Sequence, residues 1–321
     1  MNYLGQQIEK ITRVRKVLAC ATMMASILLI ARLATAETFS FTPGDPDGKV
    51  GALSCRASPG NIETETADDF VLQRTTIINK ATIKGLLPTD TDVTKIKDVE
   101  VEIYHVFPLD SAPASGHVPS RVNSPSDVEI GTATRDGSSG TLKFSAIVEN
   151  ASFSVDHTVV NGINRSPANV THGEPGVTRE EVEITITFTS PIILPPGNYF
   201  FRPEVLVTGG DFLYLSAPRP IAAPGNAFVG DRQAWIRNST LSPDWLRIGA
   251  DIIVDGDAYN MAFSLNGETV PNAGTPGRKN CKGKTISALS EQFGTIDDAT
   301  LALGFASVTA LQDGVSLFCG Q

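Results

Sequence analysis

Two tryptophans lie ten residues apart among charged side chains, a combination that can bind sugars. Trp235 and Trp245 are accompanied by Arg237 and Arg247 in the segment QAWIRNSTLSPDWLRIG. An exposed tryptophan offers a flat apolar surface on which a sugar ring can stack, and charged neighbours can hold its hydroxyl groups. The alternative is that both rings are buried and anchor a loop, as large aromatic side chains often are. The first interpretation predicts a ligand-binding site made of these four residues.

Two groups of aspartates suggest a calcium site. Asp68 and Asp69 precede an apolar strand segment, and Asp251, Asp255 and Asp257 lie near the far end of the same predicted domain. Carboxylate oxygens are the ligands that Ca²⁺ prefers. If the first and last strands of the domain are neighbours, the five side chains can converge. The alternative is ordinary turn chemistry, in which an aspartate binds its own backbone. Ca²⁺ is the one cofactor that the sequence suggests.

Local motifs for catalysis are missing, so no catalytic residue is assigned. The chain contains no Gly-x-Ser-x-Gly, no His-Glu-x-x-His and no Cys-x-x-Cys. Gly283-Lys284-Thr285 matches the end of a phosphate-binding loop, but Arg278 stands where that motif needs a glycine. The four histidines are scattered. A pair of carboxylates for glycoside hydrolysis cannot be chosen from the acidic residues by sequence alone.

The elements that would position these residues are predicted to be β-strands. Glu181–Phe188 reads EVEITITF, a strict alternation of polar and apolar residues that indicates a strand with one wet face. Val99–Tyr104 alternates in the same way. No helical period appears between residues 37 and 266, so the strands should pair antiparallel. We therefore expect a mainly β protein with an antiparallel β-sandwich of jelly-roll type over residues 37–266.

The C-terminal segment has a different pattern. Residues 267–280 read GETVPNAGTPGRKN, a polar sequence that predicts a flexible linker. Residues 281–321 then predict a small module of three short helices, with Thr285 and Ser307 as helix-capping residues. A module of about 40 residues is too small for its core to suffice alone.

The cysteines supply the missing stabilisation. Cys281 and Cys319 lie at the two ends of the helical module, and a disulfide between them would close a 38-residue loop. The chain-entropy model gives such a bridge about 4 kcal/mol. Cys55 belongs to the other domain. The sequence therefore predicts a Cys281–Cys319 disulfide and an unpaired Cys55.

The N-terminus predicts export. Basic residues precede an apolar run from Val17 to Ala31, and Ala34-Thr35-Ala36 follows, so residues 1–36 have the form of a signal peptide cleaved near Ala36. Cleavage would remove five basic residues and one acidic residue and change the net charge from −9 to −13. Such an acidic chain is unsuited to nucleic acid. The mature chain is expected to be secreted, periplasmic or extracellular, without a membrane span.

Several segments resemble a known group of proteins. Ala67-Asp68-Asp69-Phe70 resembles the opening motif of uncharacterised secreted bacterial β-sandwich proteins, and Leu194–Phe201 and Ala262–Gly267 resemble later signatures of that group. Cys281–Leu289 resembles the start of a small C-terminal module found in diverse secreted bacterial proteins. The resemblance covers most of residues 61–321. It implies a secreted β-sandwich but no particular chemistry.

These observations predict a secreted, non-catalytic β-sandwich protein whose partner is an extracellular glycan or a surface protein. The alternative is a secreted hydrolase of polysaccharide or ester substrates, which rests on the abundant acids and the two tryptophans. A deep pocket with two facing carboxylates would favour the enzyme, whereas a flat face bearing tryptophan would favour binding.

Overall fold

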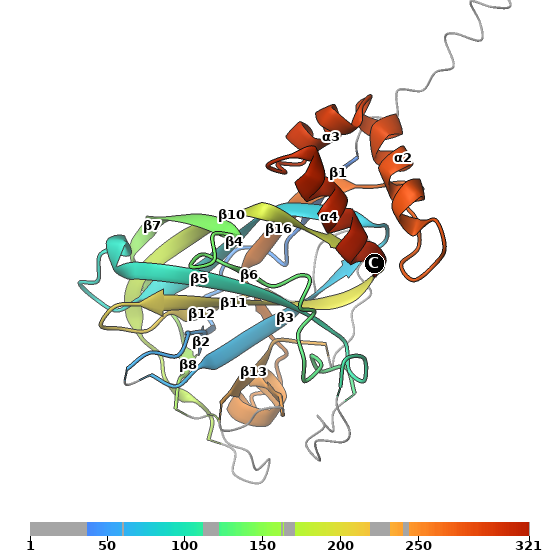
Figure 1. Ribbon diagram of the computed structural model, residues 1–321. Coiled ribbons are helices and arrows are strands. Elements are labelled where there is room, and N and C mark those ends of the chain that lie inside the picture. Colours follow the sequence, from blue (N-terminus) through green and yellow to red (C-terminus); the bar gives the residue numbers. More distant parts are fainter. Residues whose placement is uncertain are drawn as a thin grey trace, which may run out of the picture.

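Two β-sheets packed face to face form the body of the protein, and three helices lie beside one end of it (Figure 1). The structure, a computed structural model, describes residues 37–59, 61–111, 122–161, 163, 171–218, 232–239 and 244–320. The β-sandwich and the small helical module are thus confirmed. The predicted signal peptide lies outside the described residues. Within them no helix is long and apolar enough to span a membrane.

The larger sheet is built around two long neighbouring strands, β4 and β10, which pair antiparallel. In β10 the predicted alternation is confirmed, because Val182, Ile184 and Ile186 are buried in the core while Glu183 is partly exposed. The strand order is β1 (Thr38–Phe41), β16 (Phe263–Thr269), β4 (Thr76–Leu87), β12 (Leu213–Ala217), β2 (Val50–Leu53), β8 (His157–Val159) and β9 (Glu174–Pro175); β10 (Thr178–Leu194) joins β4 to β7 (Leu142–Ser154), and β15 (Asn260–Met261) pairs with β12.

The smaller sheet has six strands. Their order is β14 (Leu246–Arg247), β13 (Trp235–Asn238), β3 (Thr64–Leu72), β11 (Gly197–Val207), β5 (Ile96–His105) and β6 (Arg135–Asp136). Among the described strands, β2 and β8 form the one parallel pair, an exception to the antiparallel pairing that the sequence predicts. Two short helical turns complete the body, a 3₁₀ turn over Val93–Lys95 and a π-helix over Ile248–Ile253.

The core lies between the sheets and is rich in aromatic rings. Phe201 of the smaller sheet stacks on Phe263 of the larger one with ring centroids 5.0 Å apart, and Phe41 packs against Phe70 and Phe263. Such rings bury a large apolar area each, and their contacts add to that gain. The apolar faces of the two sheets therefore hold the sandwich together.

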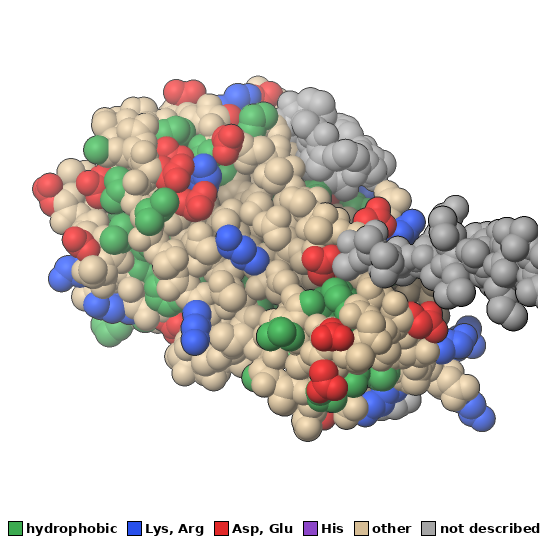
Figure 2. Space-filling model, turned by 90° about the horizontal axis from the view of Figure 1, so that it is seen from above, with side chains coloured by type: hydrophobic (Ala, Val, Ile, Leu, Met, Phe, Trp, Pro, Cys, Tyr) green, Lys and Arg blue, Asp and Glu red, His purple; other side chains and the backbone are tan. Residues whose placement is uncertain are grey.

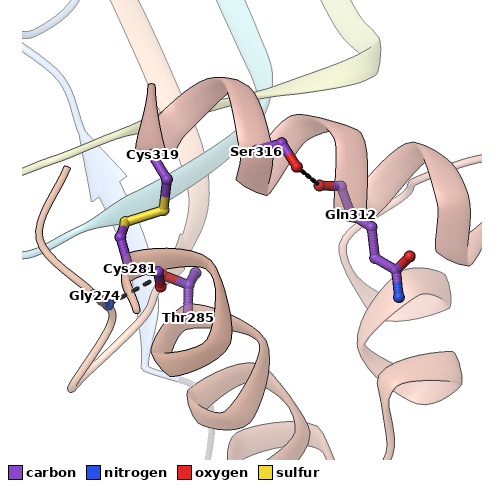
Figure 3. The surroundings of a disulfide bond; sticks show 6 residues. All are labelled: Gly274, Cys281, Thr285, Gln312, Ser316 and Cys319. Carbon is purple, nitrogen blue, oxygen red and sulfur yellow. Dashed lines mark hydrogen bonds between the residues drawn. A yellow bond between two sulfur atoms is a disulfide. The ribbon is translucent and has the colours of Figure 1, made fainter. Parts of the chain in front are cut away.

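The three C-terminal helices are α2 (Cys281–Phe293), α3 (Ile296–Ala302) and α4 (Val308–Cys319). Ser307 caps α4 as predicted, since its hydroxyl accepts a hydrogen bond from the Ala310 amide at 3.1 Å. The prediction for Thr285 is wrong, because α2 begins four residues earlier. The Thr285 hydroxyl instead lies inside the helical module, where it donates a hydrogen bond to the Cys281 carbonyl and accepts one from the Gly274 amide (Figure 3).

The predicted disulfide is confirmed and Cys55 is unpaired and buried. Cys281 and Cys319 join the start of α2 to the end of α4, with Cα atoms 5.7 Å apart (Figure 3).

The first half of the segment predicted as a flexible linker is instead packed. Strand β16 continues to Thr269, so the first three residues of 267–280 belong to the sheet. Val270 is buried in the core of the helical module, together with Ile77 of β4 and, at its margin, Ile193 of β10. The module therefore shares a core with the sandwich. The sequence of the linker is polar, but its few apolar residues decide how it packs.

Candidate functional site

The two tryptophans form no exposed stacking face. Trp235 and Trp245 are each 1% exposed. The Trp245 indole donates to the Ser126 carbonyl at 3.0 Å, and the Arg237 guanidinium lies over its ring at 4.4 Å. The prediction of an exposed platform is therefore wrong, and the alternative of buried rings that anchor a loop describes both residues. The physical reason is that they lie on the outer face of the smaller sheet, beneath the loop around Ser126.

The two arginines of the predicted site are engaged with acids. Arg237 binds Glu65 through Nε at 2.7 Å and the Tyr104 hydroxyl through Nη2 at 3.1 Å. Arg247 binds Asp251 four residues further on, at 3.1 Å. Both arginines hold neighbouring elements in place.

The five predicted calcium ligands are not gathered into one site. Asp68 accepts a hydrogen bond from the Met261 amide at 2.8 Å, Asp257 pairs with Lys49 at 2.6 Å, and Asp255 binds the Tyr259 hydroxyl. Within the described part of the chain, no group of three His, Cys, Asp or Glu side chains could hold a metal ion. Asp255 also accepts a hydrogen bond from the Asp257 amide at 2.9 Å, as the turn-chemistry alternative describes, whereas the Asp68 carboxylate binds a backbone amide far along the chain.

A buried network of charges covers the outer face of the smaller sheet, and sequence reasoning missed it. Arg202 of β11 is 2% exposed and contacts Glu65 at 3.5 Å, Glu102 at 2.8 Å and Glu204 at 2.8 Å. Its neighbours come from β3, β5 and β11 itself, which are adjacent in the sheet. In the sequence, the alternation of Glu100, Glu102 and Tyr104 indicates a strand face that is exposed to solvent. In the structure, loops cover this face.

The acids in this network outnumber the arginines. Three glutamates, Glu65, Glu102 and Glu204, share two arginines, Arg202 and Arg237. One carboxyl therefore has no arginine of its own. Burial accordingly raises the pKa of Glu204 to about 9, against the opposing effect of Arg202, and also raises the pKa of Glu102. Glu204 is therefore neutral at pH 7. Its side chain is fully buried, so no substrate can reach it.

The same network anchors a surface loop. Arg56, just before residues 57–61, contacts Asp136 at 3.0 Å and Glu100 at 3.3 Å, and also binds Asp98. Burial raises the pKa of Asp98 and of Glu100. For Asp136, burial is outweighed by hydrogen bonds from Ser138 and Arg56, which lower its pKa. The start of the loop is thus fixed to β5 and β6.

Two hollows lie on either side of this loop. The larger has a volume of about 600 Å³ between the loop and the turn that connects β11 to β12, and the smaller has about 260 Å³. Asn61 lines both. The larger is lined by Ala57, Ser58, Pro59, Asn61, Leu206, Val207, Thr208, Gly209 and Gly210, and the smaller by Leu53, Asn61, Ile62, Thr64, Val160, Asn161, Asp211 and Asn238.

Each wall of the hollows is held by a specific contact. The Asn61 side-chain amide donates to the Ser58 hydroxyl at 3.2 Å, and the backbones of the two residues bond to each other. Glu174 accepts hydrogen bonds from the Val160 and Asn161 amides at 2.8 and 2.9 Å. Asp211 pairs with Arg179 at 2.7 Å. The hollows are therefore shaped before any ligand arrives. No sequence motif marks these residues.

The chemistry of the lining favours binding over catalysis. It combines apolar side chains with a few amide and hydroxyl groups and backbone, and it contains neither histidine nor cysteine. Asp211, its one acid, is ion-paired. Cys55 lies just before the loop, but burial raises the pKa of its thiol to about 11, so the reactive thiolate is scarce.

Comparison with models of known protein families finds none that matches the chain, and comparison with curated proteins finds no match either.

Proposed function

We propose that this protein is a secreted, non-catalytic binding module that holds a hydroxyl-rich glycan in the two hollows around Asn61. The observation that carries the proposal is the separation between the hollows and the groups with shifted pKa. The hollows are open and lined by apolar side chains with a few amides and hydroxyls, whereas Glu102 and Glu204 lie in a network closed by arginines. An enzyme would need both in one place.

The lining suits a glycan. Each sugar hydroxyl both donates and accepts hydrogen bonds, and an amide side chain offers one group of each kind. Asn61, Asn161 and Asn238 supply three such amides in the smaller hollow, and the larger hollow has Asn61 with the Ser58 and Thr208 hydroxyls. The larger hollow, at about 600 Å³, falls within the usual range for ligand pockets of ~300–1,000 Å³, and the smaller one adds about 260 Å³ beside it. A short oligosaccharide is therefore the ligand class that we favour over a protein surface.

Export is the second part of the proposal. It is supported by the basic, apolar and Ala-x-Ala pattern over residues 1–36 and by the resemblance to secreted bacterial β-sandwich proteins. N-terminal sequencing of the secreted protein should begin at Glu37. Secreted material that retains residues 1–36, or that carries lipid at Cys20, would contradict it.

The hydrolase alternative has one observation in its favour, the facing carboxyls of Glu65 and Glu102 on Arg202. Their side chains are only 10% and 12% exposed, which leaves no room for a polymer.

A glycan array with turnover measured in parallel tests the proposal. We expect retention of a defined set of oligosaccharides, and chromatography of the same mixtures should show no product. Appearance of shortened or de-esterified product that depends on the protein would overturn it, as would failure of every glycan to bind.

A further inference from the structure

Strand β7 has a free edge. It pairs with β10 along one side, and no other strand of the described chain pairs with it. Most of its 13 residues are exposed, including Ile147 at 57% and Val148 at 45%. Such an edge presents unpaired backbone groups and readily accepts another strand. Figure 2 looks onto the molecule from above and shows hydrophobic side chains among Asp and Glu on this surface.

The two faces of β7 are well defined. Phe144 and Ala146 pack against the core, whereas Ile147 lies opposite Glu183 on the outer face. Glu149 is on that outer face too, since it reaches Lys84 at 3.2 Å. The ladder with β10 is regular from Lys143 to Val148 and shifts register immediately after it. Lys143–Glu149 is therefore the segment able to receive a new strand.

We propose that this segment pairs antiparallel with the same segment of a second copy, with Ala146 opposite its own counterpart. In a continuous sheet, directly opposed residues point to the same face. The two-fold axis must therefore lie between a residue and its own counterpart in the second copy. With the axis at Ala146, Lys143 of one copy lies opposite Glu149 of the other, and the symmetry forms this pair twice. Opposite charges in directly opposed positions stabilise a sheet.

The same register also pairs apolar side chains. Phe144 of one copy meets Val148 of the other on the core side, and the two Ile147 side chains become diagonal neighbours on the outer face. Both exposed apolar residues are thereby covered. Among the possible registers, the one with its axis at Ala146 places Lys143 opposite Glu149. Because the segment is complementary to itself in this register, a second copy is the partner that we propose for this edge.

Charge reversal tests the register. We expect sedimentation velocity of the full mature chain to show a reversible dimer, with a Kd on the order of 10–100 µM because a seven-residue edge buries little area. Lys143→Glu alone, and Glu149→Lys alone, each place like charges opposite each other twice. Each should weaken the dimer at least about tenfold. A 1:1 mixture of the two variants should form a heterodimer as tight as the wild type.

The controls separate this effect from misfolding. Lys284→Glu reverses an exposed charge on α2 and should leave the dimer unchanged. The double variant Lys143→Glu/Glu149→Lys should dimerise again, although it also lacks the contact with Lys84. Sedimentation as a monomer up to ~1 mM would overturn the proposal, and so would a dimer unaffected by either reversal or a mixture that fails to associate. None of these outcomes depends on glycan binding.

Discussion

Arg202 shows how single residues hold the candidate site together. It lies on the outer face of a sheet, where solvent is usual, yet it is 2% exposed and surrounded by three glutamates. The network extends through Glu100 to Arg56 and so to the loop beside the hollows. Buried charges are tolerated only where they are paired, so removing one partner is costly.

We expect Arg202→Met to lower the free energy of unfolding by about 3–5 kcal/mol, because it leaves buried carboxyls without their cation. Urea unfolding followed by circular dichroism measures the change. Arg74→Met is the matched control, since Arg74 and its partner Glu37 are 55% and 63% exposed. The control should lose less than about 1 kcal/mol. Equal losses in the two variants would show that the network contributes little.

Glu204 predicts a specific pH dependence. Its pKa is about 9 in the folded protein, against about 4.3 in an unfolded chain. Between these values the folded state keeps a proton that the unfolded state has released, so the free energy of unfolding falls as the pH rises from about 4 to about 9. Glu204→Gln removes this titration and should flatten the curve. The urea concentrations at the unfolding midpoints of both proteins, measured at pH 5, 7 and 9, test this prediction. A mutant slope equal to that of the wild type would contradict the assignment, and Glu37→Gln serves as the exposed control.

At the scale of elements, the helical module depends on both the disulfide and the sandwich. The bridge closes a 38-residue loop, while Ile77 and Val270 place part of the module's core on the strands. The module is thus neither an independent domain nor a flexible appendage.

Replacing Cys281 and Cys319 by serine should cost about 4 kcal/mol in the chain-entropy model. We expect hydrogen exchange to increase in α2 and α4 and also at the end of β10, because Ile193 packs against the same core. Mass spectrometry of deuterium uptake measures this, with Cys55→Ala as the control that leaves the helices protected. If exchange rose in the helices alone, the shared core would make no energetic contribution.

The strands were predictable where one face is wet and the other apolar. The alternation in Glu181–Phe188 gave β10, although the strand is longer than the alternating run. Strands β2 and β13 were missed because Val50–Leu53 and Trp235–Asn238 are short and largely buried on both sides, so they lack alternation. Ser307 was found because helix capping is a local property.

The site was less predictable because its parts come from distant segments. Alternation in β5 shows which residues share a face, but the sequence does not show that a loop covers that face and buries Glu102. The same cover buries Trp245. Asn61 carries no local signal, since the hollows arise where a loop meets the turn that connects β11 to β12.

At the scale of the whole molecule, different parts of the sandwich have different roles. The apolar layer between the sheets provides stability, and the charged network on the smaller sheet fixes the loop at 57–61. In the function that we propose, the hollows beside that loop hold the ligand. A ligand that occupies them therefore meets a surface that is already arranged, which lowers the entropic cost of binding.

Calorimetric titration of Asn61→Ala with the oligosaccharide that the array selects tests the central claim most directly. Asn61 lines both hollows, so loss of its amide should weaken binding about tenfold, the loss expected for about one hydrogen bond. Asn198→Ala, at the opposite end of β11, is the matched control and should bind as the wild type does. Wild-type affinity in Asn61→Ala, or equal weakening in both variants, would contradict the account.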